Sequence, residues 1–281
     1  AEAYIAGLEK YLQPVIAVDK VRYVGEPLAV IVADSRALAE DAAAKIAVTI
    51  EPLSPLSDWR TAETDATLLF EENGTNVATR YTVGFGDTDA AFAGADYTRR
   101  EFFRAHRHTA VPMETRGVVA EWDAAAGRLI VNGATKVTFF NRRALAAMMQ
   151  MPESAIDLME LDVGGGFGVR GEFYPEDFLI PFATRKLGRP IKWIEDRLEH
   201  MQAANHSREI DCELEIACRR DGTIIGLRGK IFGDMGAYTR TNSGVVPAKA
   251  AQFLHGPYRI PAIKIEVSAF MTSKTPVGTY R

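Results

Sequence analysis

Residues 161–177 read LDVGGGFGVRGEFYPED, and this stretch decides how the rest of the chain is interpreted. Five glycines, at 164, 165, 166, 168 and 171, follow a strand-like apolar run and precede a helix-like one. Without Cβ atoms, the backbone N–H groups of such a turn can approach an anionic or oxygen-rich ligand closely, and a helix N-terminus adds partial positive charge. So many glycines carry an entropic cost that a turn without a ligand would avoid. We therefore predict a ligand-binding loop between a strand and a helix.

The loop has a second interpretation. Residues 166–171 spell GxGxxG, and Asp196 ends the next predicted strand at a spacing that suits a ribose hydroxyl, as in dinucleotide-binding folds. Three features argue against it: the mid-chain position, the bulk of Phe167 inside the turn, and Pro175, which delays the helix past the last glycine. The dinucleotide interpretation stays open as the alternative.

Composition limits the class of protein. The chain has 281 residues, of which 47% are hydrophobic and 25% charged, as in a soluble globular protein of about two domains. A net charge of −4 gives no basic excess for nucleic acid, and no apolar run reaches the ~18 residues of a membrane helix. The start has no signal-peptide pattern, and Cys212 and Cys218 alternate with polar residues as buried strand thiols. We expect a cytoplasmic protein.

The order of elements predicts a mixed α/β (α+β) fold. Strands are expected over 21–33 and 47–53 around a helix over 36–46, followed by a linker-like stretch over 54–98. Further on, we expect two strands around the turn 124–127, a helix over 142–151 capped by Asn141, a strand over 155–163 and a helix over 176–187. A strand over 190–196 and a hairpin across Asp221-Gly222 complete the pattern. The chain ends abruptly at TPVGTYR, so we expect a truncated or split polypeptide.

Several motifs together resemble one family. DVGGGFG, RHTAVPMETRGVVAEWD, RPIKWIEDRLEHM, FGDMGAY and the terminal GTYR are similar to the molybdopterin-binding subunit of the xanthine dehydrogenase, aldehyde oxidase and aerobic carbon monoxide dehydrogenase family. The resemblance spans nearly the whole chain in the right order but covers only the front part of such a subunit. It implies a hammerhead-like domain over 1–70 whose beginning is missing, a linker over 71–98, and the first part of a molybdopterin-binding domain over 99–281.

The resemblance also implies an activity. It is that of a molybdenum hydroxylase, which oxidises an aldehyde or an N-heteroaromatic substrate with oxygen derived from water. The cofactor would be molybdenum-molybdopterin, in its plain or cytosine dinucleotide form. Iron–sulfur clusters and FAD would lie on separate partner subunits, and the remaining C-terminal part of the molybdenum subunit, with the catalytic Glu, would lie outside this chain. As an isolated fragment, the chain is expected to be inactive.

Site residues are carried over position by position. The family's GFG turn, whose backbone amides lie against the cofactor, matches residues Gly165, Gly166, Phe167 and Gly168. Arg281 matches the Arg of the (A/T)(Y/F)R motif, which suits anionic oxygens. Lys136 falls where relatives carry a Gln beside the metal, and a Lys there would bring positive charge or a general acid. Phe167, Lys136 and Arg281 are therefore the catalytic candidates, and no protein side chain is predicted as a metal ligand.

The substrate-side positions depart from the purine enzymes. Gly171 stands where those carry a Glu, with Glu172 one place on, and Lys249 stands where they carry an Arg. These differences disfavour a purine substrate. The GVRGEFYP continuation resembles relatives that do not oxidise carbon monoxide, which disfavours that substrate too. Two other functions stay open: an NAD(P)-dependent dehydrogenase using the GFGVRG loop, and a non-catalytic split subunit that serves as an assembly module.

Overall fold

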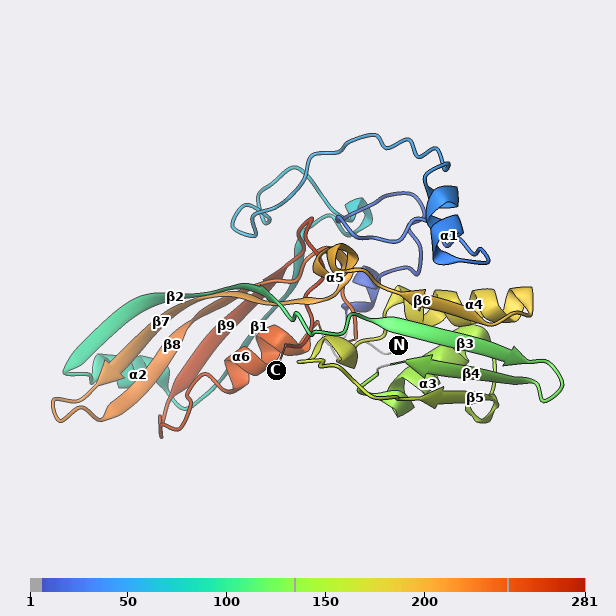
Figure 1. The fold of residues 1–281 in the computed structure, drawn as a ribbon. Coiled ribbons are helices and arrows are strands. Elements are labelled where there is room, and N and C mark those ends of the chain that lie inside the picture. The colour runs from blue at the N-terminus through green and yellow to red at the C-terminus, as the bar shows by residue number, and fades with distance from the viewer. Residues whose placement is uncertain (1–6, 134, 242, 281) are drawn as a thin grey trace. The chain divides into compact units, whose positions relative to one another are not determined.

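The structure is a computed structural model that describes residues 7–133, 135–241 and 243–280 (Figure 1). The chain folds into two compact units, each built from stretches that are far apart in the sequence. Unit 1 consists of the residues up to Leu12, Leu56–Ala110 and those from Asn205 on, and unit 2 consists of Gln13–Pro55 and Val111–Ala204. The chain therefore passes between the units several times.

Unit 1 is organised around a five-stranded sheet. Its strand order is β1 (Val77–Phe85), β9 (Ile263–Phe270), β8 (Ile224–Asp234), β7 (His206–Cys218) and β2 (Tyr97–Thr109). All neighbours are antiparallel except β8 and β9, which are parallel. The short helices α2 (Thr88–Ala93) and α6 (Val245–Gln252) both contact this sheet.

Alternation of apolar and polar residues explains why these segments form strands. On β8 and β9, the side chains of Ile231, Ile265 and Val267 are fully buried, and they form the core with Ile263 and Leu227. The predicted hairpin is confirmed: β7 and β8 pair across Asp221-Gly222, and Gly222 has a φ of 89°, which the turn requires.

The N-terminal segment packs on unit 1 through aromatic contacts. The ring of Tyr11, in η1 (Glu9–Tyr11), lies 5.1 Å from Phe70, and Phe70 lies 5.8 Å from Tyr238. Thr239 N–H donates to the carbonyl of Tyr11 at 2.8 Å, which ties this segment to the loop after β8.

Unit 2 contains a four-stranded sheet in the order β5 (Ile156–Met159), β4 (Arg128–Gly133), β3 (Gly117–Asp123) and β6 (Ile191–Ile194). Only β4 and β5 are parallel neighbours. Helices α3 (Thr138–Met149) and α4 (Pro175–Leu187) pack together on the sheet and share its core of Val131, Leu145, Met149 and Ile180. The unit also holds α1 (Arg36–Ala43), α5 (Arg197–Ala203) and the 3-10 turns η3 (Glu153–Ala155) and η4 (Val169–Gly171).

Capping explains the limits of α4. Pro175 occupies its first position, where the missing N–H costs nothing, and the Asp177 carboxylate accepts from Tyr174 N–H at 2.9 Å. Gly188 ends the helix with a left-handed φ of 62°. The longest described helix is α4, with 13 residues, and none of the described helices is long and apolar enough to cross a bilayer.

Two predicted strands are wrong. Among the described residues, 21–33 and 47–53 form no strand, although the helix between them is confirmed as α1. Their apolar side chains are exposed: Val30 by 37%, Val32 by 42% and Ile50 by 62%. A strand needs a neighbouring strand to pair with, and within the described residues these two segments pair with no other strand, so β-propensity alone did not decide their conformation.

The structure also differs from two further expectations. The linker-like stretch 54–98 contains η2 (Glu71–Asn73), the sheet strand β1 and the helix α2. Asn141 is not the cap of α3 but lies inside it, because the helix begins at Thr138. Its side-chain amide instead donates to Thr135 Oγ1 at 2.8 Å and to the Glu172 carbonyl at 3.4 Å, so it ties α3 to the segment after the glycine loop.

Candidate cofactor loop

The glycine loop, residues 164–168, lies between the segment after β5 and the turn η4. Its end is fixed by three hydrogen bonds: Val169 N–H to Gly166 O at 3.0 Å, Gly171 N–H to Gly168 O at 2.9 Å, and Tyr174 Oη to Val169 O at 2.9 Å. The loop therefore leads into α4 through a tight turn rather than directly.

Three loop residues have positive φ values. Gly165 and Gly168 have φ values of 99° and 109°, which a residue with a Cβ rarely adopts, and Phe167 has a φ of 50° despite its side chain. The Phe167 ring is 43% exposed. A strained, exposed aromatic residue in a glycine loop is typical of a functional site.

The backbone amides of the loop are available to a ligand. Within the described residues, the N–H groups of Gly165, Gly166 and Gly168 donate no hydrogen bond. A group of amide donors that the fold leaves unused suits an acceptor-rich ligand, because amides stabilise oxygen without titrating. The loop packs closely against Glu114 because residue 164 is a glycine: a Cβ at this position would lie 2.5 Å from Glu114 Cβ.

The structure brings Lys136 and Gly171 together beside this loop. Lys136 N–H donates to the Arg170 carbonyl at 3.0 Å, and a Cβ added at Gly171 would lie 3.8 Å from Lys136 Cδ. The Lys136 side chain is exposed. A larger residue at 171 would therefore contact the aliphatic part of the Lys136 side chain.

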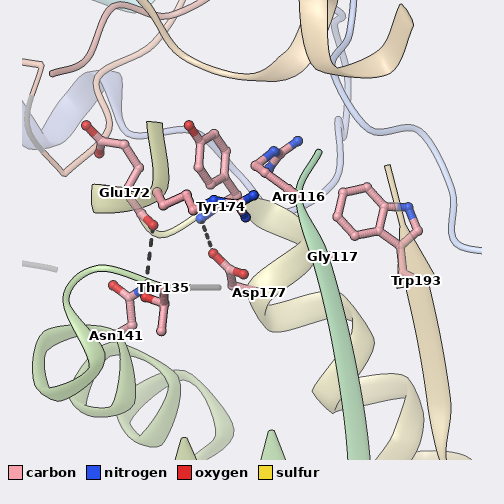
Figure 2. Close-up of a pocket in the computed structure, with 9 residues that line it drawn as sticks. Arg116, Gly117, Thr135, Asn141, Glu172, Tyr174, Asp177 and Trp193 are labelled. Carbon is pink, nitrogen blue, oxygen red and sulfur yellow. Dashed lines mark hydrogen bonds between the residues drawn. The ribbon is translucent and has the colours of Figure 1, made fainter. Parts of the chain in front are cut away.

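Glu172 lies in a different environment. It is 1% exposed and lines a polar cavity with Thr135, Asn141 and Asp177 (Figure 2). The free space in this cavity is about 20 Å³, which is room for a water molecule but not for an organic substrate.

Charges at the cavity are strongly coupled. Burial raises the pKa of Asp177 to about 6, although its bond from Tyr174 N–H and the charge of Arg116 oppose the shift. Burial lowers the pKa of Arg116, but the carboxylates of Glu176 and Glu195 more than offset this and raise it. Glu195 is buried too, yet His200 and Arg116 lower its pKa to about 2. The Arg116 guanidinium and the Glu195 carboxylate are thus charged at neutral pH.

Of the last two predicted site residues, only Lys249 lies within the described structure, in unit 1. Lys249 is exposed on α6, where its Nζ donates to Gln252 Oε1 at 2.7 Å and lies 5.4 Å from the Phe253 ring. Arg281 lies outside the described residues. The neighbouring Tyr280 ring stacks on His108 at 6.5 Å, and the Arg208 guanidinium lies 5.8 Å from it.

Sequence reasoning missed the residues that support the loop. Glu114, Arg116 and Arg170 all contact it or the segment beside it, but no role was predicted for them. The sequence did contain a signal that could have predicted these contacts. Charged residues that become buried within apolar or glycine-rich motifs require polar partners, and PMETRG and GFGVRG are two such motifs.

Comparison with known proteins agrees with this geometry. The family model of the molybdopterin cofactor-binding domain matches residues 69–281. The chain belongs to this family. It is 42% identical over 274 residues to the 6-hydroxypseudooxynicotine dehydrogenase complex subunit gamma of Paenarthrobacter nicotinovorans, covering 98% of this chain and 34% of that protein. It is 34% identical to the nicotine 6-hydroxylase large subunit of the same organism, again covering 98% of this chain and 34% of that protein.

A solved structure shares the fold. The crystal structure of quinoline 2-oxidoreductase from Pseudomonas putida 86 matches with a TM-score of 0.88 and 35% identity, covering 98% of this chain and 36% of that one. The chain therefore spans about a third of the length of the relatives that it matches. The predicted family and the mixed α/β fold are confirmed.

The residues present fit the cofactor of the family. Molybdopterin is rich in oxygen and nitrogen acceptors, and the loop offers the unused amides of Gly165, Gly166 and Gly168 with the close backbone approach that glycine allows. A domain that binds the molybdopterin cofactor accounts for the five glycines.

Proposed function

We propose that the chain is the cofactor-binding part of a multi-subunit molybdenum hydroxylase that acts on an N-heteroaromatic substrate. The observation that carries the proposal is the loop of residues 164–168, in which the unused amides of Gly165, Gly166 and Gly168 and the left-handed Phe167 match an acceptor-rich ligand. The substrate class is supported by the relatives, whose names refer to nicotine and quinoline compounds. An aldehyde substrate is the second candidate.

Each predicted site residue takes a part in this proposal. Once bound, the cofactor would supply the oxidation of a ring carbon. The amides of Gly165, Gly166 and Gly168 would bind and orient it, and Phe167 would limit the space beside it. Lys136 would place positive charge next to it, and Gly171 would leave room for substrate beside the Lys136 side chain. For the other candidates the proposal keeps the roles that the family resemblance implies, Arg281 toward the cofactor and Glu172 and Lys249 toward the substrate.

The assembly belongs to the same proposal. A hammerhead-like domain over 1–70, a linker over 71–98 and the molybdopterin-binding part over 99–281 would continue into a C-terminal part of the same subunit. Separate iron–sulfur and FAD subunits would accept the electrons, in the cytoplasm. The relatives are named as a complex subunit and a large subunit, which supports a multi-chain assembly.

The nicotinamide alternative has little support. A dinucleotide loop joins two parallel strands that lie close together in a sheet. Here the strand after the loop and α4 is β6, which lies at the opposite edge of the sheet from β5, with β4 and β3 between them.

The decisive experiment measures cofactor content in the full-length subunit purified with its partners from its own host. We expect near-stoichiometric molybdenum by mass spectrometry and a pterin that is identified, with or without cytosine, after oxidation. A metal-free protein that binds a nicotinamide cofactor would refute the proposal. A complex that assembles without molybdenum would support the assembly-module alternative instead.

The role of Lys136 has its own test. Lys136→Gln should keep the molybdenum content but change kcat by about tenfold or more, since the removal of one charge-stabilising donor has effects of 10²–10³ in other enzymes. Lys192→Gln, at an exposed lysine on β6, is the matched control. Equal kcat in both variants would remove Lys136 from the site.

A further inference from the structure

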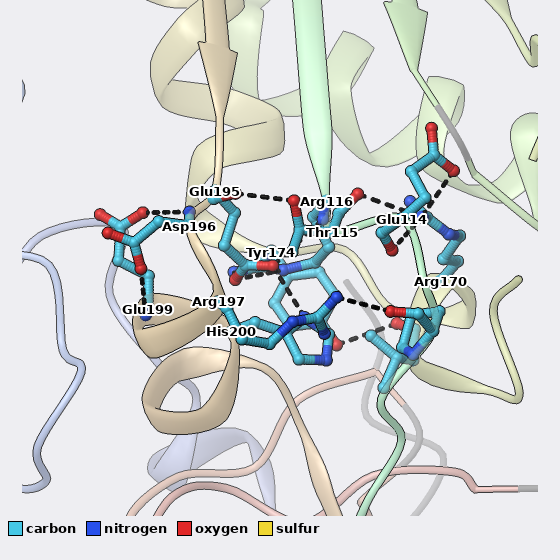
Figure 3. A network of polar contacts seen from close by, with 12 residues as sticks. Glu114, Thr115, Arg116, Arg170, Tyr174, Glu195, Asp196, Arg197, Glu199 and His200 are labelled. Atoms are coloured by element: carbon cyan, nitrogen blue, oxygen red, sulfur yellow. Dashed lines mark hydrogen bonds and ion pairs between the residues drawn. The ribbon is translucent and has the colours of Figure 1, made fainter. Parts of the chain in front are cut away.

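Arg170, two residues after the glycine loop, folds back beneath it. Its side chain is only 3% exposed. The guanidinium donates Nε–H to Gly165 O at 2.7 Å, and its Nη2 donates to Glu114 O at 2.9 Å, Glu114 Oε2 at 2.8 Å and Thr115 O at 3.1 Å (Figure 3). One side chain thus joins the beginning of the loop to the segment before β3.

Glu114 holds the same part of the loop from the other side. Its Oε2 accepts from Gly164 N–H at 2.8 Å as well as from Arg170, and its own N–H donates to Gly164 O at 3.2 Å. The close approach requires a glycine, because a Cβ at 164 would lie 2.5 Å from Glu114 Cβ. Gly164 is therefore fixed by backbone and side chain of one residue.

The segment that carries Glu114 is itself anchored in the core of unit 2. Thr115 Oγ1 donates to Glu195 O at 2.7 Å, and Glu195 N–H donates to Arg116 O at 2.9 Å. The Glu195 carboxylate accepts from Arg116 N–H at 3.1 Å and from Arg116 Nε at 3.0 Å. His200 Nδ1 lies 2.8 Å from Glu195 Oε2. The loop is thus connected to a rigid, buried ion network.

We propose that Glu114 and Arg170 are positioning residues for the cofactor, which together keep the amides of Gly165, Gly166 and Gly168 turned toward it. This inference rests on the proposed function. At its end the loop is fixed by η4 and Tyr174, and at its beginning by these two side chains together with the backbone bond from Glu114 N–H to Gly164 O. Removal of the Glu114 carboxylate would release the Gly164 N–H, and removal of the Arg170 guanidinium would release the Gly165 carbonyl, while β3, β5 and α4 keep their own hydrogen bonds.

The chemistry of the pair explains the residue types. Burial lowers the pKa of Arg170, while the charge of Glu114 favours its protonated form. The acceptors around Arg170 lie in different directions, and the planar fork of a guanidinium supplies N–H donors that match them, whereas a lysine ammonium does not. Arg170→Lys should therefore fail to replace Arg170, whereas Glu114→Gln keeps the acceptor oxygen and should replace Glu114 in part.

The test uses the full-length molybdenum subunit in complex with its partners. Wild type, Arg170→Lys, Glu114→Gln and Glu114→Ala are compared by molybdenum retained after gel filtration, by the Mo(V) electron paramagnetic resonance spectrum, and by thermal midpoint. Arg143→Lys is the matched control, because Arg143 is 74% exposed on α3 and has only a 3.6 Å contact to Glu153.

We expect cofactor loss about 10- to 100-fold faster in Arg170→Lys and Glu114→Ala, the range seen when residues that orient a metal's ligands are replaced. A changed Mo(V) spectrum should accompany it, with Glu114→Gln between Glu114→Ala and wild type. If Arg170→Lys and Glu114→Ala retain molybdenum to within twofold of wild type and give the wild-type Mo(V) spectrum, the inference is overturned and the proposed function stands. Absence of molybdenum from wild type would overturn the proposed function itself.

Discussion

Replacement of Glu195 by Gln tests the buried network in unit 2. The Glu195 side chain is fully buried, with the guanidinium of Arg116 and the ring of His200 as its partners. Glu195→Gln keeps the shape but removes the charge, so Arg116 would retain only Glu176, at 3.2 Å, as a carboxylate partner. We expect a large loss of stability at neutral pH, because a buried cation would lose most of its compensation.

The pKa of Glu195 gives the magnitude. The fold lowers it from 4.5 to about 2, and at 1.36 kcal/mol per pKa unit this corresponds to about 3 kcal/mol of stability from the ionised form. Because the folded-state pKa is the lower one, this contribution is complete above pH 4.5 and is lost as the pH falls from 4.5 toward 2. The difference between variant and wild type should therefore be largest at neutral pH and shrink below pH 4.5.

The assay is urea unfolding followed by tryptophan fluorescence, from pH 7 down to pH 3.5. Trp193 is a suitable reporter because its ring lies 5.4 Å from the Arg116 guanidinium. Glu40→Gln is the control, because Glu40 pairs with Arg36 on α1 with both side chains at least 60% exposed, and its midpoint should stay near wild type. A loss that is equally small for both variants, or one that does not depend on pH, would refute the reasoning.

Other predictions concern separate features. Asp177→Asn should stabilise the protein by at most about 3 kcal/mol at pH 8, because the fold raises the pKa of Asp177 from 3.8 to about 6 and so disfavours its carboxylate form above pH 6. This gain in stability should vanish below pH 3.8, and the control Asp41→Asn, at an exposed position, should show no gain. Gly236→Ala should lower the thermal midpoint far more than Gly74→Ala: both have left-handed φ values, 73° and 65°, but only at 236 would the Cβ lie 2.3 Å from a backbone oxygen. Burial raises the pKa of Cys212 to about 11, so its labelling by a thiol reagent at pH 8 should be slow in the native state and fast in urea.

Local patterns predicted much of the fold. The hairpin between β7 and β8, the helix α4 and the strand-loop-helix arrangement around residues 164–168 all follow from alternation, glycine positions and Pro175. These features depend on residues close together in the sequence, where periodicity and turn chemistry decide the conformation.

Features that depend on distant partners were not predictable in the same way. Residues 28–32 have strand propensity but no partner strand in the described structure, whereas Val77–Phe85, in the stretch expected to be linker-like, becomes strand β1 because β9 pairs with it. The contact between Glu114 and Arg170 joins residues 56 positions apart. Sequence periodicity does not predict such a pair, and only the free-energy cost of burying an arginine without a partner indicates that one must exist.

The strand order of unit 1 also has a consequence during protein synthesis. Of the five described strands of this sheet, β1 and β2 are made first and lie at its two edges, and β1 pairs with β9, the last of the five to be made. At the usual ~5–20 residues per second, roughly 10 to 40 s pass between the end of β1 at Phe85 and the end of β9 at Phe270. β1 therefore leaves the ribosome well before its partner, and β2 waits for a shorter time, until β7 is made. Arg99, Arg100, Glu101 and Arg104 make β2 highly charged, which discourages its association with other nascent chains until β7 arrives.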